Sequence, residues 1–95
     1  MPAYVVVQAE ALNPDEYRVY QQQVPATLEP HGGRFIIRGG DQHVLEGSSP
    51  GRLVVLEFPS IDHARAWYHS PDYQAIAPIR QQHGRTGFMV IVPGV

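Results

Sequence analysis

The chain contains no cysteine and no lysine, and each absence removes several classes of chemistry. Without cysteine it has no disulfide, no thiolate nucleophile and no cysteine-bound metal, and nothing indicates an oxidising compartment. Without lysine it has no Schiff-base nucleophile, no anchor for pyridoxal phosphate and no phosphate-binding lysine of the Walker type. All seven positively charged residues are therefore arginines.

Patterns for export, membrane insertion and nucleic-acid binding are also missing. Residues 1–4 carry neither the positive charge nor the apolar stretch of a signal peptide, and no apolar run approaches the roughly 20 residues of a membrane span. A net charge of -2, with the arginines scattered along the chain, provides no basic surface for a phosphate backbone. We therefore expect a cytoplasmic protein with no nucleic-acid or membrane partner.

Length and composition favour a single globular domain over residues 1–95. Typical domains contain roughly 100–150 residues, which leaves no room for a second one. Hydrophobic residues make up 43% of the chain and charged residues 17%, and there are 9 glycines and 9 prolines. This composition is typical of a folded chain with many turns rather than a disordered, fibrous or repeat protein.

Four segments rich in β-branched and aromatic residues are predicted to be strands. They lie at residues 3–11, 34–38, 52–58 and 87–92. Residues 39–51 are rich in glycine, serine and proline, and they are predicted to form a loop with a short extended piece at 44–46.

Signals for helix starts lie between these strands. Asn13, followed by a proline and two acidic residues, is expected to cap a first helix that ends before the glycine pair at 32–33. Ser60 and Ser70 are expected to cap the two pieces of a second helical region. Pro25 is expected to kink the first helix, and Pro78 is expected to bend or end the second helical piece, because proline lacks the backbone N–H of the helical hydrogen bond.

The resulting order is β-α-β-β-α-β, which predicts an α+β protein with a ferredoxin-like fold. Right-handed crossovers in this order place both helical regions on the same face of a four-stranded antiparallel sheet. The opposite face is expected to be apolar as well, because Val6 alternates with Val5 and Val7, and the third and fourth strands show the same pattern. A homodimer that packs sheet against sheet is the simplest way to cover that face, and partial cover by the 39–51 loop is the alternative.

Several short segments together resemble the family known as domain-of-unknown-function family 1330, in the dimeric α/β-barrel superfamily. The resemblance covers nearly the whole chain and implies a ferredoxin-like fold and a homodimer, without supplying a reaction. Because the superfamily includes cofactor-free monooxygenases, isomerases and dye- or haem-handling enzymes, it allows a small-molecule enzyme. The segments are Gly32-Gly33-Arg34-Phe35, Arg38-Gly39-Gly40, Leu45-Glu46-Gly47, Leu56-Glu57-Phe58-Pro59-Ser60, Ala66-Trp67-Tyr68 and Ser70-Pro71-Asp72-Tyr73-Gln74. The positions carried over from the family are Arg38, Glu46, Glu57, Trp67, Tyr68, Ser70 and Tyr73.

Glu57 interrupts an otherwise apolar strand, and an ionised carboxylate in that position needs a partner. Arg38, at the end of the neighbouring strand, is the expected partner, and Glu46 competes for the same guanidinium. In the functional interpretation, Arg38 holds an anionic group of a ligand while Glu57 serves as a general acid or base. In the structural interpretation, Arg38 forms an ion pair with one of the two glutamates and fixes the hairpin or the dimer.

Aromatic residues with polar tips are concentrated in the predicted helical layer. We expect them to line a pocket for a flat or carboxylated small molecule, with their hydroxyl groups placed to donate. Packing in the core or in an interface is the alternative, and it is favoured for Trp67. These residues are Tyr17, Tyr20, Trp67, Tyr68 and Tyr73.

The five histidines show no spacing typical of a metal site, so no metal is expected. His31 lies near the end of the first helix, where it either reaches the pocket as a base or is a solvated helix-end residue. Gly39 and Gly40 form either an anion-binding turn or a tight bend. Ser70 is expected to act as a cap rather than a nucleophile, because it lies in no G-x-S-x-G motif.

Together these features predict a homodimer that binds a small organic molecule in a pocket between sheet and helices and uses no cofactor. Any catalysis is expected to be acid-base chemistry by Glu57, with Arg38 as the anchor. A non-catalytic binding or accessory dimer, in which the Arg/Glu pair is structural, is the alternative. The remaining binding residues are expected to be Tyr17, His31, Glu46, Trp67, Tyr68, Ser70 and Tyr73.

Overall fold

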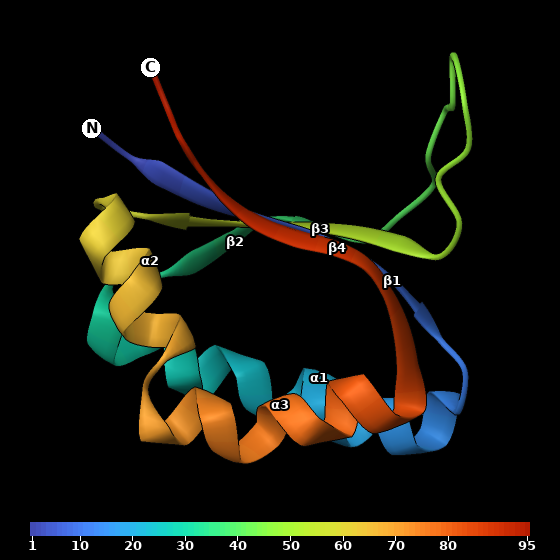
Figure 1. The fold of residues 1–95 in the computed structure, drawn as a ribbon, viewed down its shortest axis with the longest axis horizontal. Coiled ribbons are helices and arrows are strands. Elements are labelled where there is room, and N and C mark those ends of the chain that lie inside the picture. Colours follow the sequence, from blue (N-terminus) through green and yellow to red (C-terminus); the bar gives the residue numbers. More distant parts are fainter.

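The computed structural model describes residues 1–95 and contains four strands, three α-helices and one 3-10 turn (Figure 1). The strands are β1 (Ala3–Ala11), β2 (Arg34–Arg38), β3 (Arg52–Phe58) and β4 (Gly84–Pro93). The helices are α1 (Pro14–Leu28), α2 (Ile61–Tyr68) and α3 (Pro71–His83), and the 3-10 turn η1 (Glu29–His31) follows α1. None of the helices combines the length and the apolar character that crossing a membrane requires.

The strands form one antiparallel sheet in the order β2-β3-β1-β4. The connections from β1 to β2 and from β3 to β4 each pass over one intervening strand and carry the helices. All three helices lie on the same side of the sheet (Figure 1), as right-handed crossovers require. The predicted α+β class and ferredoxin-like topology are therefore confirmed.

The two serine caps form as predicted, whereas the asparagine cap does not. Ser60 accepts a hydrogen bond from the His63 N–H at 3.2 Å, and Ser70 accepts one from the Tyr73 N–H at 3.2 Å. Asn13 precedes α1, but its side chain makes no capping hydrogen bond. Its amide instead contacts a histidine ring at the end of α3, so the prediction of a side-chain cap at this position is wrong.

Pro25 and Pro78 both lie inside their helices: α1 continues past Pro25 to Leu28, as the sequence predicts, and α3 continues past Pro78 to His83, so Pro78 does not end that helix. A proline inside a helix removes one backbone hydrogen bond. Burial of the following turn holds each helix in place despite this loss: Thr27 and Leu28 are buried after Pro25, and Arg80 is buried after Pro78. Tertiary packing therefore overrides the local signal at both positions.

The core lies between the sheet and the helices, with Trp67 at its centre. This side chain is 1% exposed and packs against Phe58 and Tyr73, with ring centroids 5.4 Å and 4.2 Å away. Its indole Nε1–H donates to the Thr27 hydroxyl at 3.0 Å, so the only polar atom of the ring is satisfied. One side chain of α2 thereby connects α1, α3 and β3.

The sheet face opposite the helices is apolar, as strand alternation predicts, and we call it the open face. Val6 in β1 lies opposite Val55 in β3 and Val90 in β4, so three valines form a row across three strands. Val90 is 42% exposed, and its neighbours Phe88 and Val92 are 41% and 39% exposed. The open face consists of Tyr4, Val6, Gln8, Arg34, Ile37, Leu53, Val55, Glu57, Phe88, Val90 and Val92.

The 39–51 loop stands away from the sheet on the side of the open face and does not lie across it (Figure 1). Its base is fixed by a chain of hydrogen bonds. Gln8 donates to the Ser49 hydroxyl at 3.1 Å, Ser49 contacts Gln42, and Gln42 donates to the Gly51 carbonyl at 2.9 Å. No strand forms inside the loop, so the short extended piece expected at 44–46 is absent. The loop thus reaches the open face at Gln8 and leaves Val90 exposed, whereas Val55 in the same row is only 8% exposed.

We expect Thr27→Val to lower the free energy of unfolding by about 1–3 kcal/mol, because the buried Trp67 N–H would lose its acceptor. Thr27→Ser keeps the hydroxyl group and should cost clearly less. Urea denaturation followed by circular dichroism measures both variants against the wild type. Equal losses in the two variants would mean that the methyl group, and not the hydrogen bond, matters at this position.

Candidate functional site

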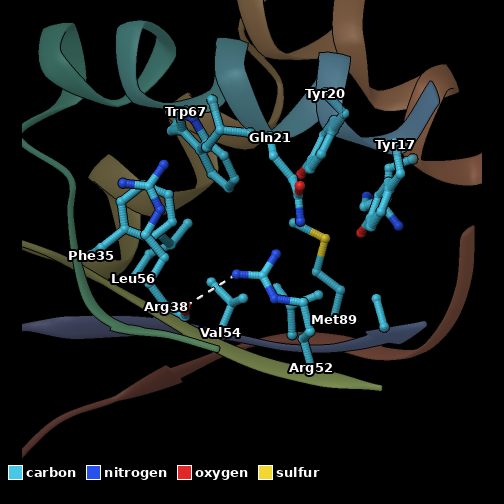
Figure 2. Close-up of a pocket in the computed structure, with 14 residues that line it drawn as sticks. Tyr17, Tyr20, Gln21, Phe35, Arg38, Arg52, Val54, Leu56, Trp67 and Met89 are labelled. Atoms are coloured by element: carbon cyan, nitrogen blue, oxygen red, sulfur yellow. Dashed lines mark hydrogen bonds between the residues drawn. The ribbon is translucent and has the colours of Figure 1, made fainter. Parts of the chain in front are cut away.

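A cavity of about 170 Å³ lies between the sheet and the helices, beside the core (Figure 2). Side chains from the helices reach toward it from one side, and side chains of the strands form its floor. A cavity of about 150 Å³ is large enough to hold benzene, so this space suits a single aromatic ring. Its apolar lining includes Val7, Ala9, Val24, Phe35, Val54, Leu56, Trp67 and Met89, and its polar lining is Tyr17, Tyr20, Gln21, Arg38, Arg52 and Arg80.

A bulge in β2 turns Arg38 toward this cavity. In unbroken alternation Arg34 and Arg38 would share a face, because their spacing is even. The register of β2 on β3 shifts between Phe35 and Ile37, so one extra residue reverses the direction of the side chains that follow. Arg38 therefore lies opposite Val54 and lines the cavity, with its guanidinium carbon 4.2 Å from the centroid of the Phe35 ring.

Arg52, the first residue of β3, brings a second guanidinium to the cavity (Figure 2). Its Nη2 donates to the backbone carbonyl of Arg38 at 3.0 Å. Gly39 leaves room for this arrangement, because its φ is +80° and a Cβ there would lie 2.7 Å from the Arg52 Nε. The missing side chain of Gly39 thus leaves the space through which the Arg52 side chain passes.

Arg80 on α3 supplies a third guanidinium, and only 4% of this residue is exposed. Its Nε donates to the Tyr73 hydroxyl at 3.2 Å, and its Nη1 donates to the Thr86 hydroxyl at 2.7 Å. No carboxylate lies within ion-pair distance of it. Burial of a charge without a counter-charge is costly, so two neutral hydroxyl groups compensate Arg80 only in part.

The cavity is positively charged although the whole chain carries a net charge of -2. The ion pairs of the molecule use Arg18, Arg34 and Arg85. The arginines of the cavity take part in none of them, and no Asp, Glu or His is among the lining residues. Three guanidinium groups without a counter-charge therefore surround one small space.

Tyr17 and Tyr20 add neutral hydrogen-bond donors to this space. Burial raises the pKa of Tyr17, and burial together with the neighbouring Tyr73 raises the pKa of Tyr20. The two rings are stacked with centroids 5.5 Å apart. The Tyr20 hydroxyl lies 2.9 Å from the Tyr73 hydroxyl, which also accepts from Arg80. Both phenols keep their protons at neutral pH, so they act as donors and not as bases.

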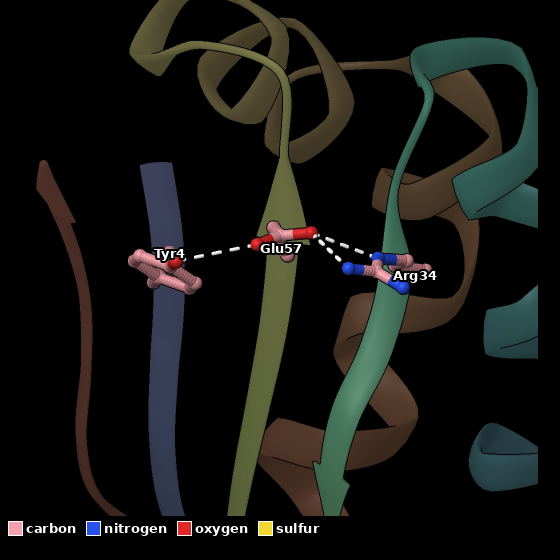
Figure 3. Close-up of polar contacts among 3 residues, drawn as sticks. All are labelled: Tyr4, Arg34 and Glu57. Carbon is pink, nitrogen blue, oxygen red and sulfur yellow. Dashed lines mark hydrogen bonds and ion pairs between the residues drawn. The ribbon is translucent and has the colours of Figure 1, made fainter. Parts of the chain in front are cut away.

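Glu57 lies on the open face and not at the cavity (Figure 3). Its Oε1 accepts from Arg34, with Nη2 at 2.6 Å and Nε at 2.8 Å, and its Oε2 accepts from the Tyr4 hydroxyl at 3.2 Å. The hydrogen bond from Arg34 holds the pKa of Glu57 below its ordinary value, although burial acts in the opposite direction. The expected pairing with Arg38 is wrong, because the β2 bulge places Arg38 on the other face of the sheet.

The predicted aromatic residues divide between the cavity wall and its support. Tyr17, Tyr20 and Trp67 line the cavity. Tyr73 is fully buried behind the lining, where it contacts both Tyr20 and Arg80. Tyr68 packs against Tyr73 with ring centroids 5.6 Å apart.

The other predicted binding residues are not at the cavity. Ser70 caps α3, Glu46 is exposed in the 39–51 loop, and His31 ends the 3-10 turn η1. None of the three is among the lining residues. No group of three or more His, Asp or Glu side chains gathers in a way that could hold a metal ion.

Two charged residues of the cavity, Arg52 and Arg80, were not singled out from the sequence. Alternation along β3 contained the signal for Arg52, because it shares a face with Val54. Helical spacing contained the signal for Arg80, which follows Ile76 by one turn and Tyr73 by two turns on the buried face of α3. A charged residue on such a face is a candidate for a functional site.

Solved structures of low sequence identity share this fold. A protein of unknown function from Rhodopseudomonas palustris is 18% identical with a TM-score of 0.68, and the match covers 99% of this chain and 82% of that chain. SnoaB, a cofactor-independent oxygenase from Streptomyces nogalater, is 12% identical with a TM-score of 0.64, over 99% of this chain and 93% of that chain. A dimeric ferredoxin-like protein of unknown function from Thermobifida fusca is 19% identical with a TM-score of 0.61, over 97% of this chain and 88% of that chain. At these identities the likeness concerns the fold alone.

No curated protein matches this chain in sequence. A family model described as Domain of unknown function (DUF1330) matches residues 2–95, which is almost the whole chain. This match confirms the resemblance carried by the short sequence segments. The protein therefore belongs to the DUF1330 family.

Proposed function

We propose that this protein is a homodimer that binds one small organic molecule in the cavity of each subunit. The observation that carries the proposal is the composition of the cavity, in which an apolar and partly aromatic lining surrounds a few convergent polar groups. Sites for small molecules usually have this composition. Trp67 and Phe35 supply flat walls, and Arg38, the anchor that the sequence predicts, is one of three guanidinium groups around the same space.

Ligand binding is better supported than a reaction in which Glu57 acts as the general acid or base. A general acid or base must come within hydrogen-bond reach of the reacting group, and Glu57 lies on the opposite face of the sheet from the cavity. Its contacts with Arg34 and Tyr4 support the alternative in which the Arg/Glu pair is structural.

A cofactor-independent enzyme is the second candidate, and the fold shared with the oxygenase SnoaB favours it by analogy. In such an enzyme, proton transfer within the cavity would fall to the phenols of Tyr17 and Tyr20, since the lining contains no carboxylate or imidazole. Burial raises the pKa of both phenols, so they stay protonated at neutral pH and donate hydrogen bonds, but they are weak acids, which keeps this candidate second to binding.

Binding can be measured directly, because the only tryptophan of the chain lines the cavity. We expect some planar one-ring aromatic compounds, tested as acids and as neutral amides, to change the emission of Trp67 saturably with one site per chain. Val54→Phe fills the cavity from the sheet and should abolish the change, because the ring would occupy the space of the ligand.

The control for this experiment is Val19→Phe, which adds the same ring at an exposed position of α1 outside the cavity. It should bind like the wild type. The binding proposal fails if no compound gives a saturable signal, or if Val54→Phe responds as the wild type does.

The homodimer is supported by the exposed side chains of Phe88, Val90 and Val92 on the open face and by the 39–51 loop, which stands away from the sheet instead of lying across this face. An apolar sheet face that its own chain covers only in part is typical of an interface. Glu57 and Arg34 also lie on this face, where a second copy would bring them out of solvent.

We expect light scattering at micromolar concentration to give about twice the 10.6 kDa of one chain. Val90→Arg should give a monomer, because it would place an unpaired charge in the centre of the interface. Val19→Arg is the matched control, since Val19 and Val90 are both 42% exposed and Val19 lies on α1. A monomeric wild type, or a dimeric Val90→Arg, would contradict the proposed interface.

The ion pair on the open face predicts a pH dependence of stability. Because the pKa of Glu57 is lowered from its ordinary value of 4.5, its contribution to stability is complete above that value and is lost as the pH falls through the lower folded-state pKa. We expect Glu57→Gln to be less stable than the wild type at pH 7, with the difference shrinking between about pH 5 and pH 3. Thermal melting at fixed protein concentration measures the difference.

Arg34→Gln provides the matched background for this measurement. In that background Glu57→Gln should cost little at any pH, because the partner charge is already absent. A loss that is the same at pH 3 and pH 7 would show that the carboxylate charge is not what stabilises the protein at this position.

A further inference from the structure

We infer that the ligand of the cavity is a small flat carboxylate, such as an aromatic acid, held by the guanidinium groups of Arg52 and Arg80 with Arg38 at the opening. This inference rests on the proposed function, because it names the class of molecule that the same cavity takes. It follows from three features of the lining: its excess of hydrogen-bond donors, its uncompensated charge and its flat aromatic walls.

The polar lining consists almost wholly of donors. Arginine guanidinium groups donate and do not accept, and the two phenols keep their protons at neutral pH. Gln21 is the only lining side chain with a carbonyl acceptor. A ligand with several acceptors is therefore matched to this lining, whereas a cationic or donor-rich ligand is not.

The charge balance favours an anion over a neutral acceptor. Arg80 is 4% exposed and contacts only two hydroxyl groups, and neither Arg52 nor Arg38 has an ion pair. A bound anion would supply the missing counter-charge at the buried guanidinium, where electrostatic interactions are strongest. Because a guanidinium matches a carboxylate through two parallel N–H···O bonds, a carboxylate uses this arrangement well.

The exposure of the three arginines is graded, which orients the ligand. Arg80 is buried, Arg52 is half-buried and Arg38 is exposed. The anionic group is thus drawn inward from the opening, and the flat part of the molecule lies against Trp67 and Phe35. The volume of about 170 Å³ limits that flat part to about one ring.

Matched pairs of an acid and its primary amide test the inference, because the members of each pair differ mainly in charge. The pairs are benzoate with benzamide, salicylate with salicylamide, and cinnamate with cinnamamide, and Trp67 emission reports binding. We expect at least one acid to bind about tenfold or more tightly than its amide at low salt, and its affinity to fall as ionic strength rises. Inorganic phosphate should compete only weakly, since it lacks a flat apolar part.

Arg52→Gln should weaken binding of that acid by about tenfold and leave binding of the amide nearly unchanged. Arg18→Gln removes the same charge from the exposed surface of α1 and should bind the acid like the wild type. Arg80→Met should also lose the acid, and its melting temperature without ligand should equal or exceed that of the wild type, because a buried charge without a counter-ion is removed.

The outcomes separate this inference from the proposed function. If an amide binds as tightly as its acid, the cavity takes small molecules but not specifically anions, and the inference is overturned while the proposed function stands. If Arg18→Gln weakens acid binding as much as Arg52→Gln, the effect is general surface charge and the inference is again overturned. If no acid and no amide binds, both fail together. If phosphate competes as well as the best acid, the cavity recognises charge alone and the flat carboxylate is wrong.

Discussion

The structure depends on one constraint: its sheet has two apolar faces, and its helices cover only one of them. Four strands of alternating apolar residues have two faces to cover, and the helices of the chain lie on only one of them (Figure 1). The helix face holds the core and the cavity. The open face holds the valine row and the ion pair between Arg34 and Glu57. The cavity and the exposed apolar residues thereby lie on opposite sides of one layer of backbone.

A single extra residue in β2 decides which arginine serves which side. Before the bulge Arg34 lies on the open face beside Glu57, and after it Arg38 lines the cavity. A one-residue slip in a strand exchanges its faces, so a bulge is a compact way to direct two similar side chains in opposite directions. Gly39, just after the bulge, then leaves the space in which Arg52 approaches the backbone of Arg38.

The sequence alone predicts the regular elements of the structure but not this bulge. The element order, the first three strands and the serine caps at positions 60 and 70 followed from local patterns that the fold keeps. The partner of Glu57 did not follow, because period-two alternation contains no signal for an inserted residue. The length of α3 did not follow either, since the burial that carries this helix past Pro78 is a property of the assembled core.

The cavity differs from the rest of the fold in how its buried charge is compensated. The polar groups around Trp67 are satisfied, and no fully buried polar side-chain atom lacks a hydrogen-bond partner. Arg80 is hydrogen-bonded, but its charge has no counter-charge, because its partners are hydroxyl groups and not a carboxylate. Local departures of this kind concentrate at functional sites, where stability is given up for binding. In a chain with nine acidic residues and seven arginines, a cavity without any carboxylate keeps its positive charge available to a molecule from outside.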